Sequence, residues 1–192
     1  MMALLNPDRR PTVNIAFVRS VRLICAVGLM SLAMMPTFPD ATAHAAVRKA
    51  DEARIANCIN QAAAGRIWLE KALWGLRDQE AGWIGAEVRN SNGTYDLGPM
   101  QINTWWVPKI AAQLGRSVAE VRHWLRFDAC FNVGAARWIF LAGLRDNGSF
   151  WKAVGVYHSP TSWRQQRYAL SVAGHMKRRF GESGLSAVGF AP

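Results

Sequence analysis

The sequence predicts an all-α domain with one irregular cleft loop. Apolar residues recur at helical spacing along most of the chain, and the alternation typical of strands is almost absent. A polar, glycine-marked stretch at residues 84–98 interrupts this pattern, and its Asn92-Gly93 pair is compatible with a short hairpin. Residues 46–192 are long enough for a single domain with one hydrophobic core.

The first 45 residues predict a secretory signal peptide. Arginines precede a mostly apolar run of 13 residues at positions 23–35, and the small-x-small triplet at 43–45 follows as a cleavage site. The alternative is a membrane anchor, but the run is shorter than the ~20 residues that a membrane-spanning helix needs. We therefore expect cleavage after Ala45 and export of the mature chain.

Cys58 and Cys130 remain beyond the predicted leader. In an exported protein such a pair predicts a disulfide, which would close a long loop and contribute on the order of 4 kcal/mol by the loop-entropy relation. Two buried free thiols are the alternative. The pair has no nearby histidines at ligand spacing, so a metal site is not expected. No organic cofactor is implied either.

Seven segments have helical periodicity or capping signals. They are residues 50–64, 66–80, 104–114, 117–125, 128–146, 149–157 and 162–177. Ser117 and Glu120 form a capping box. Asp128 and Ser149 are expected N-caps of the two helices that follow. Residues 181–192, in which Gly and Ser recur and the last residue is Pro, are expected to be loose.

A carboxyl group and a loop are predicted to face each other across the cleft. Glu80 lies at the C-terminal end of the helix over 66–80, and Gly82 follows as a helix terminator. The helix dipole disfavours negative charge at this end and so raises a carboxyl pKa. Residues 98–103 are expected to open the next helix, with Pro99 in its first turn.

Three motifs together resemble the lysozyme superfamily, and most closely the lytic transglycosylases of the SLT type. That family carries Glu-Ser-Gly-Trp, Gly-Leu-Met-Gln-Ile-Asn and Tyr-Asn-x-Gly. The counterparts in this chain are Glu80-Ala81-Gly82-Trp83, Gly98-Pro99-Met100-Gln101-Ile102-Asn103 and Tyr157-His158-Ser159-Pro160. The resemblance covers roughly residues 58–168 and implies a lysozyme-like fold. With its two cysteines, the pattern is similar to the specialised enzymes that accompany secretion, conjugation and pilus machines.

The resemblance implies a periplasmic enzyme that cleaves the β-1,4 bond between N-acetylmuramic acid and N-acetylglucosamine in peptidoglycan. Glu80 would act alone as acid and base and leave a 1,6-anhydro product. By the same analogy Met100 and Gln101 line the sugar site, and Tyr157 points its hydroxyl towards the catalytic carboxyl. Asp96 would then bind sugar or order the loop, for example through an Asx-type turn.

Two other function classes stay open. A muramidase would hydrolyse the same bond, with Glu80 as acid and Asp96 as the second carboxylate, because Asp96 also resembles the second carboxylate of animal-type lysozymes. A binding or scaffold module with this fold would hold glycan or assembly proteins with weak catalysis. The intact Glu80 argues against the scaffold, since a pure binder needs no poised acid.

Three positions depart from the family pattern. Ala81 replaces Ser, Pro99 replaces Leu, and His158-Ser159-Pro160 replaces Asn-x-Gly. The last change leaves sugar contacts there open, and His158 is expected as a helix-end cation rather than a sugar donor. Asn103 is expected to hold the loop together. None of these changes removes the proton-transfer group.

The net charge of +10 indicates an anionic partner. The basic residues are scattered and no nucleic-acid motif appears, so the cell wall with its acidic polymers is the better candidate. The chain has nine tryptophans, all after the predicted leader, and tryptophan suits both a core and stacking against sugar rings. We expect a monomer that binds glycan strands and accompanies secretion, conjugation or pilus proteins.

Overall fold

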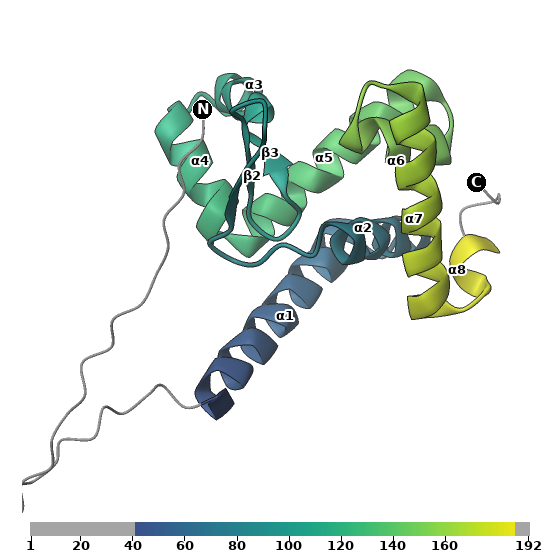
Figure 1. The fold of residues 1–192 in the computed structure, drawn as a ribbon, viewed down its shortest axis with the longest axis horizontal. Helices are drawn as coiled ribbons and strands as arrows, with labels where there is room; N and C mark the ends of the chain where they lie inside the picture. The colour runs from purple at the N-terminus through teal and green to yellow at the C-terminus, as the bar shows by residue number, and fades with distance from the viewer. Residues whose placement is uncertain (1–40, 187–192) are drawn as a thin grey trace, which may run out of the picture. The chain divides into compact units, whose positions relative to one another are not determined.

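The computed structural model describes residues 41–186, which form a mostly helical unit with a small antiparallel sheet (Figure 1). The predicted leader lies outside the described residues, apart from 41–45, which begin α1 (Ala41–Ala63). This helix therefore starts earlier than the expected position 50. In the described part of the chain, no helix is both long and apolar enough to cross a membrane.

Each of the seven helical segments expected from the sequence is helical in the structure, and the three expected caps form their bonds. The Ser117–Glu120 capping box is complete, and Asp128 and Ser149 each accept a hydrogen bond from a backbone N–H of the helix that they begin. After α1 the elements are α2 (Ile67–Glu80), β1 (Glu87–Arg89), β2 (Tyr95–Leu97), β3 (Ile102–Asn103), η1 (Thr104–Trp106), α3 (Val107–Leu114), α4 (Val118–Phe127), α5 (Ala129–Asn147), α6 (Phe150–His158), α7 (Ser162–Phe180) and α8 (Ser183–Ser186).

The described chain is mostly helical, as expected, and its cleft loop adds a small antiparallel sheet. Its strand order is β1-β2-β3, and both pairs are antiparallel. The expected hairpin at Asn92-Gly93 is confirmed, since Asn92 Oδ1 accepts a hydrogen bond from the Thr94 N–H at 3.1 Å and Gly93 has a φ of 82°. This side chain closes the turn between β1 and β2.

The expectation that residues 98–103 open a helix is wrong. Residues 98–101 form a turn, and Ile102–Asn103 is a strand. Gly98 and Gln101 both adopt left-handed backbone angles, with φ of 67° and 49°, and two such residues break a right-handed helix. Pro99 consequently lies in this turn rather than in a first helical turn.

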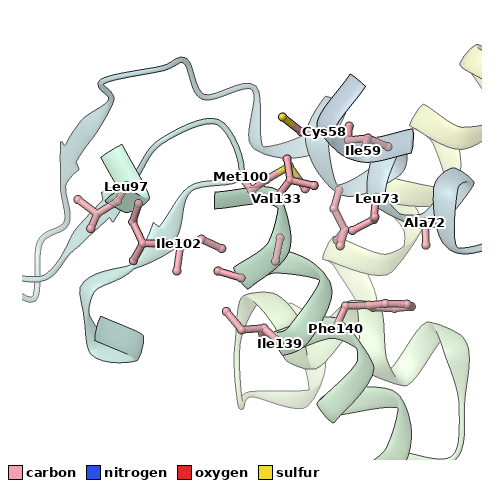
Figure 2. Close-up of a cluster of buried hydrophobic side chains, with 14 of the residues drawn as sticks. Cys58, Ile59, Ala72, Leu73, Leu97, Met100, Ile102, Val133, Ile139 and Phe140 are labelled. Atoms are coloured by element: carbon pink, nitrogen blue, oxygen red, sulfur yellow. The ribbon is translucent and has the colours of Figure 1, made fainter. Parts of the chain in front are cut away.

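The hydrophobic core surrounds α5. Ile59, Leu73, Val133 and Phe140 are each 0% exposed, and Figure 2 shows these side chains together, with Met100 among them. Full burial of side chains of this size contributes ~1.5–3 kcal/mol each. This apolar packing holds α1, α2 and α5 in fixed positions, and with them the residues at their ends.

The predicted disulfide is confirmed and joins Cys58 of α1 to Cys130 at the start of α5. The expectation of a loose end after residue 180 is partly wrong, because α8 is a short helix packed on α7. A Cβ at Gly184 would lie 2.8 Å from the carbonyl oxygen of Met176, so α8 approaches α7 closely. Residues 187–192 lie outside the described chain.

Candidate active site

A cleft of about 1070 Å³ lies between the end of α2, the β-sheet and the junction of α6 with α7. It brings together four residues predicted from the sequence, which are Glu80, Asp96, Gln101 and Tyr157. Among the described residues of its lining, Glu80 and Asp96 are the acidic ones. The carboxyl group and the loop therefore face the same space, as the sequence predicts.

Backbone geometry at the end of α2 places Glu80 at this cleft. Ala81 adopts a left-handed conformation with φ 50°, and its N–H donates to the carbonyl oxygen of Arg77 at 2.9 Å. The next residue, Gly82, packs against the turn at residues 98–101. A Cβ there would lie 2.3 Å from the carbonyl oxygen of Gly98, so a larger residue would push the loop away from Glu80.

Glu80 has the protonation behaviour of a general acid. Burial raises the pKa of its carboxyl from 4.5 to about 7, the nearby charge of Asp96 adds to the rise, and a hydrogen bond from Tyr168 opposes it. The Tyr168 hydroxyl donates to Glu80 Oε1. At neutral pH the protonated and ionised forms are both populated, so the group can donate a proton and later accept one.

The tyrosine that contacts the acid is Tyr168, which sequence reasoning missed. Tyr157, the expected partner, lines the cleft but donates its hydroxyl to the carbonyl oxygen of Met100 at 3.0 Å. Burial and the charge of Glu80 raise the pKa values of both phenols well above 10, so both remain hydroxyl donors. A tyrosine on a buried helix face needs a partner for its hydroxyl, and that requirement was the available signal for Tyr168.

Met100 does not line the cleft, which corrects its expected role. Its side chain is 0% exposed and packs in the core. Its backbone N–H donates to Oδ1 of Asn132 at 2.8 Å, and the Asn132 amide donates to the carbonyl oxygens of Leu97 and Leu125, also at 2.8 Å. The backbone of Met100, rather than its side chain, therefore shapes the site.

Asn132 is a second residue that the sequence did not single out. It is 0% exposed on the core face near the start of α5, and its three side-chain hydrogen bonds connect that helix to Met100 in the turn that carries Gln101, to the end of β2 and to α4. An asparagine among apolar positions of a helix was the signal, because a buried amide must be hydrogen-bonded. A Cβ at Gly98 would lie 2.5 Å from Asn132 Nδ2, which explains why glycine occupies that position.

Asp96 and Asn103 are coupled across β2 and β3. Asn103 Nδ2 donates to Asp96 Oδ1 at 2.8 Å and to Thr94 Oγ1 at 2.9 Å, and its Oδ1 accepts from the Trp105 N–H at 3.0 Å. The expected loop-holding role of Asn103 is confirmed. The alternative Asx-turn role for Asp96 is wrong, because that turn is made by Asn92.

Gln101 lies in the cleft lining, on strained backbone. Its φ of 49° is uncommon for a residue with a Cβ, and its amide donates to the carbonyl oxygen of Gly98 at 2.9 Å. Such strain costs of order 1–3 kcal/mol and is frequent at functional sites. The left-handed conformation of Gln101 reverses the direction of the chain, so that Ile102 can enter β3.

His158 is a stacking partner rather than a helix-end cation. Its ring lies parallel to that of Tyr168, with centroids 4.6 Å apart and planes 3° apart. Burial lowers the pKa of the imidazole, and the charge of Arg164 lowers it further. The neutral ring therefore supports the tyrosine that donates to Glu80, and the expectation of a dipole-stabilised charge is corrected.

Neither protein-family models nor curated proteins match this chain. Evidence on function accordingly comes from the geometry of the cleft and from the motifs in it. In residues 41–186, no group of three or more His, Cys, Asp or Glu side chains is arranged to hold a metal ion. The ionisable groups that line the cleft are those described above, together with two basic side chains, Lys152 and Arg164.

Proposed function

We propose that this protein has a lysozyme-like fold and is a peptidoglycan lytic transglycosylase with Glu80 as its acid and base. The observation that carries the proposal is the pKa of about 7 for a carboxyl that lines a cleft of about 1070 Å³. A carboxylic acid that is protonated near neutral pH is what glycosidic cleavage needs, because the leaving oxygen must receive a proton.

The proposed reaction has two proton transfers at Glu80. The carboxylic acid first protonates the glycosidic oxygen between N-acetylmuramic acid and N-acetylglucosamine, and the C–O bond breaks. The substrate's own N-acetyl oxygen stabilises the electron-poor anomeric carbon. The Glu80 carboxylate then removes the proton of the muramoyl 6-hydroxyl, whose oxygen bonds to the anomeric carbon. The product is a 1,6-anhydro sugar, the acid is regenerated and no water is consumed.

The neighbours of Glu80 have distinct tasks in this scheme. Tyr168 donates to Oε1, so we assign proton exchange with the substrate to Oε2. Burial keeps a large fraction of the acid protonated at neutral pH, and the hydrogen bond from Tyr168 favours the ionised form that the second step requires. Asp96 and Gln101 line the cleft and are proposed to bind sugar.

A muramidase is the second candidate, and Asp96 is the observation that favours it. This carboxylate lines the same cleft and is close enough to Glu80 to raise its pKa. In a hydrolase it would act as nucleophile or base. In the structure Asp96 Oδ1 accepts a hydrogen bond from Asn103, which suits a fixed structural carboxylate at least as well as a nucleophile.

The cellular setting is proposed on the same basis as the reaction. An exported, periplasmic enzyme with glycan strands as substrate would open the cell wall locally for a secretion, conjugation or pilus apparatus. The net charge is basic, +10 for the whole sequence and +8 without the four Arg and two Asp of residues 1–45, which suits binding to an anionic wall. Nucleic acid is not proposed as a partner.

Mass spectrometry of the muropeptides released from purified peptidoglycan tests the proposal. Anhydro-muramoyl products, lighter by one water than their hydrolysed equivalents, are expected from the protein and not from Glu80→Gln. Glu70→Gln is the matched control, because Glu70 lies in the first turn of the same helix and outside the cleft. Reducing-end products would favour the muramidase, and no release from the unmodified protein would favour a binding module.

A further inference from the structure

The cleft contains two basic side chains for which the proposed chemistry has no role. Lys152 of α6 and Arg164 of α7 line it, and both are exposed. None of the ion pairs found among the described residues includes either side chain. The imidazole of His158 has a lowered pKa, so these two residues carry the fixed positive charge of the described cleft lining.

Lys152 is positioned by a buried amide. Its Nζ donates to Oε1 of Gln165 at 2.7 Å, and Nε2 of Gln165 donates to the carbonyl oxygen of Ser159 at 2.9 Å. Gln165 is only 5% exposed, so both ends of its amide are used and its orientation is fixed. The ammonium group is therefore directed to one place and retains donors for a ligand.

The close packing of α6 on α7 makes this arrangement possible. A Cβ at Gly155 would lie 2.6 Å from the Cβ of Gln165, so the two helices meet where α6 has no side chain. Gln165 follows Arg164 directly in α7, and Lys152 lies about one turn before Gly155 in α6. The two cations thus come from neighbouring turns of two tightly packed helices.

Arg164 lies beside an aromatic ring. Its guanidinium lies 5.3 Å from the centroid of Trp163, which is 55% exposed. Its charge reaches the cleft, since it contributes to the lowered pKa of His158. A planar guanidinium forms paired hydrogen bonds with a carboxylate, which makes arginine the preferred partner of that group.

We propose that Lys152 and Arg164 form a carboxylate-binding subsite, through which the cleft selects glycan strands that carry a free carboxylate. This inference rests on the proposed function, because it names the substrate class for the same cleft. N-acetylglucosamine is neutral and offers no such group. The carboxylate can be the lactyl group of a muramic acid residue that has lost its peptide, or a carboxylate of an intact stem peptide.

Binding of soluble glycan strands to the Glu80→Gln protein tests the subsite apart from catalysis. Three preparations serve as probes: strands with intact stem peptides, strands freed of peptide by an amidase, and peptide-free strands whose carboxylates are converted to N-methylamides. Lys152→Gln and Arg164→Gln are each added to this background. Arg178→Gln is the matched control, since Arg178 is exposed on the same helix as Arg164 but outside the cleft.

We expect each cleft substitution to weaken binding of the carboxylate-bearing strands roughly fivefold, the size of a favourable exposed ion pair. Binding of the N-methylamide strands should be weaker in the parent and unchanged by either substitution. The control should change none of the affinities. Tighter binding of the peptide-free strands would assign the lactyl group, and tighter binding of the peptide-bearing strands would assign the stem peptide.

Two results would overturn the subsite and leave the proposed function intact. One is equal affinity of the parent for charged and N-methylamide strands. The other is unchanged affinity in both variants, so that Arg164→Gln and Lys152→Gln each bind every strand as tightly as the control does. A different result, no binding of any strand together with no products from the unmodified enzyme, would remove the proposed function and this inference with it.

Discussion

The two walls of the cleft are held together by different forces. The helical wall, formed by the ends of α2, α6 and α7, rests on apolar packing around residues such as Leu73 and Phe140, both 0% exposed. The sheet wall, residues 87–106, also buries apolar side chains such as Leu97 and Ile102, but its turn and strands are held in place by amide side chains, chiefly Asn103 within the wall and Asn132 from α5. Packing sets the pKa of the acid on one wall, and hydrogen bonds set the shape of the other. Substitutions in the two walls should therefore affect the protein in different ways.

The largest expected effect is the loss of activity in Glu80→Gln. General acid–base catalysis contributes ~10²–10⁴-fold, and Glu80 would supply both proton transfers, so we expect at least a 10³-fold fall in the rate of glycan release. Glu70→Gln should keep full activity. Mass spectrometry of the released products measures both variants. Retained activity in Glu80→Gln would mean that the helical wall does not supply the acid.

Asn132→Ala tests whether the sheet wall depends on its amide connection to α5. The substitution leaves three buried backbone groups without their partner, and each such group costs ~1–3 kcal/mol. We expect the free energy of unfolding to fall by about 4 kcal/mol, measured by chemical denaturation. Asn57→Ala, on an exposed face of α1, should change it by less than ~0.5 kcal/mol. A loss below ~1 kcal/mol for Asn132→Ala would contradict the contrast between the walls.

Glu80→Gln should also stabilise the protein in neutral and alkaline solution. The folded pKa of about 7 exceeds the unfolded value of 4.5. Below pH 4.5 the carboxyl is therefore protonated in both states and does not lower the free energy of unfolding. As the pH rises from 4.5 to 7, the carboxyl ionises in the unfolded state before it does in the folded state, so the unfolded state is increasingly favoured, by about 3 kcal/mol once the pH exceeds 7.

Denaturation at pH 4 and pH 8 measures this difference. The variant should match the parent at pH 4 and exceed it at pH 8. Equal stability at both values would mean that burial does not raise the pKa of Glu80.

Tyr168→Phe has the smallest expected effect and distinguishes the two tyrosines of the helical wall. Without the hydroxyl, the hydrogen bond that lowers the pKa of Glu80 is lost, so the basic limb of the pH–activity profile should move up by roughly half to one pH unit. Tyr157→Phe loses a bond to the carbonyl oxygen of Met100 instead and should leave that limb in place. The opposite outcome would restore the original assignment of Tyr157.

Features encoded within a few residues could be predicted from the sequence. The Ser117–Glu120 capping box, the caps at Asp128 and Ser149 and the hairpin at Asn92-Gly93 all depend on neighbours along the chain. The disulfide was predictable from composition and context. The position of Glu80 followed from a helix that ends just before a glycine.

Features that depend on contacts between distant elements could not be predicted in the same way. Tyr168 lies 88 positions from Glu80 in the chain, and helical periodicity shows only that it is buried. The strand at Ile102–Asn103 requires a left-handed Gln101, which the sequence does not favour. Met100 was assigned to the cleft by analogy, whereas the turn directs its side chain into the core. Lys152 and Arg164 become neighbours only because Gly155 lets two helices meet.

The bond between Cys58 and Cys130 makes the strength of the fold depend on the chemistry of its surroundings. Without the bond the chain would lose about 4 kcal/mol, a large part of the ~5–15 kcal/mol that stabilises a typical domain. In reducing surroundings the chain would unfold and refold more often, and an oxidant that forms the disulfide would then stabilise the folded state. Unfolding of the chain with and without a reductant would measure this coupling. The proposed enzyme would thereby mature only where disulfides persist.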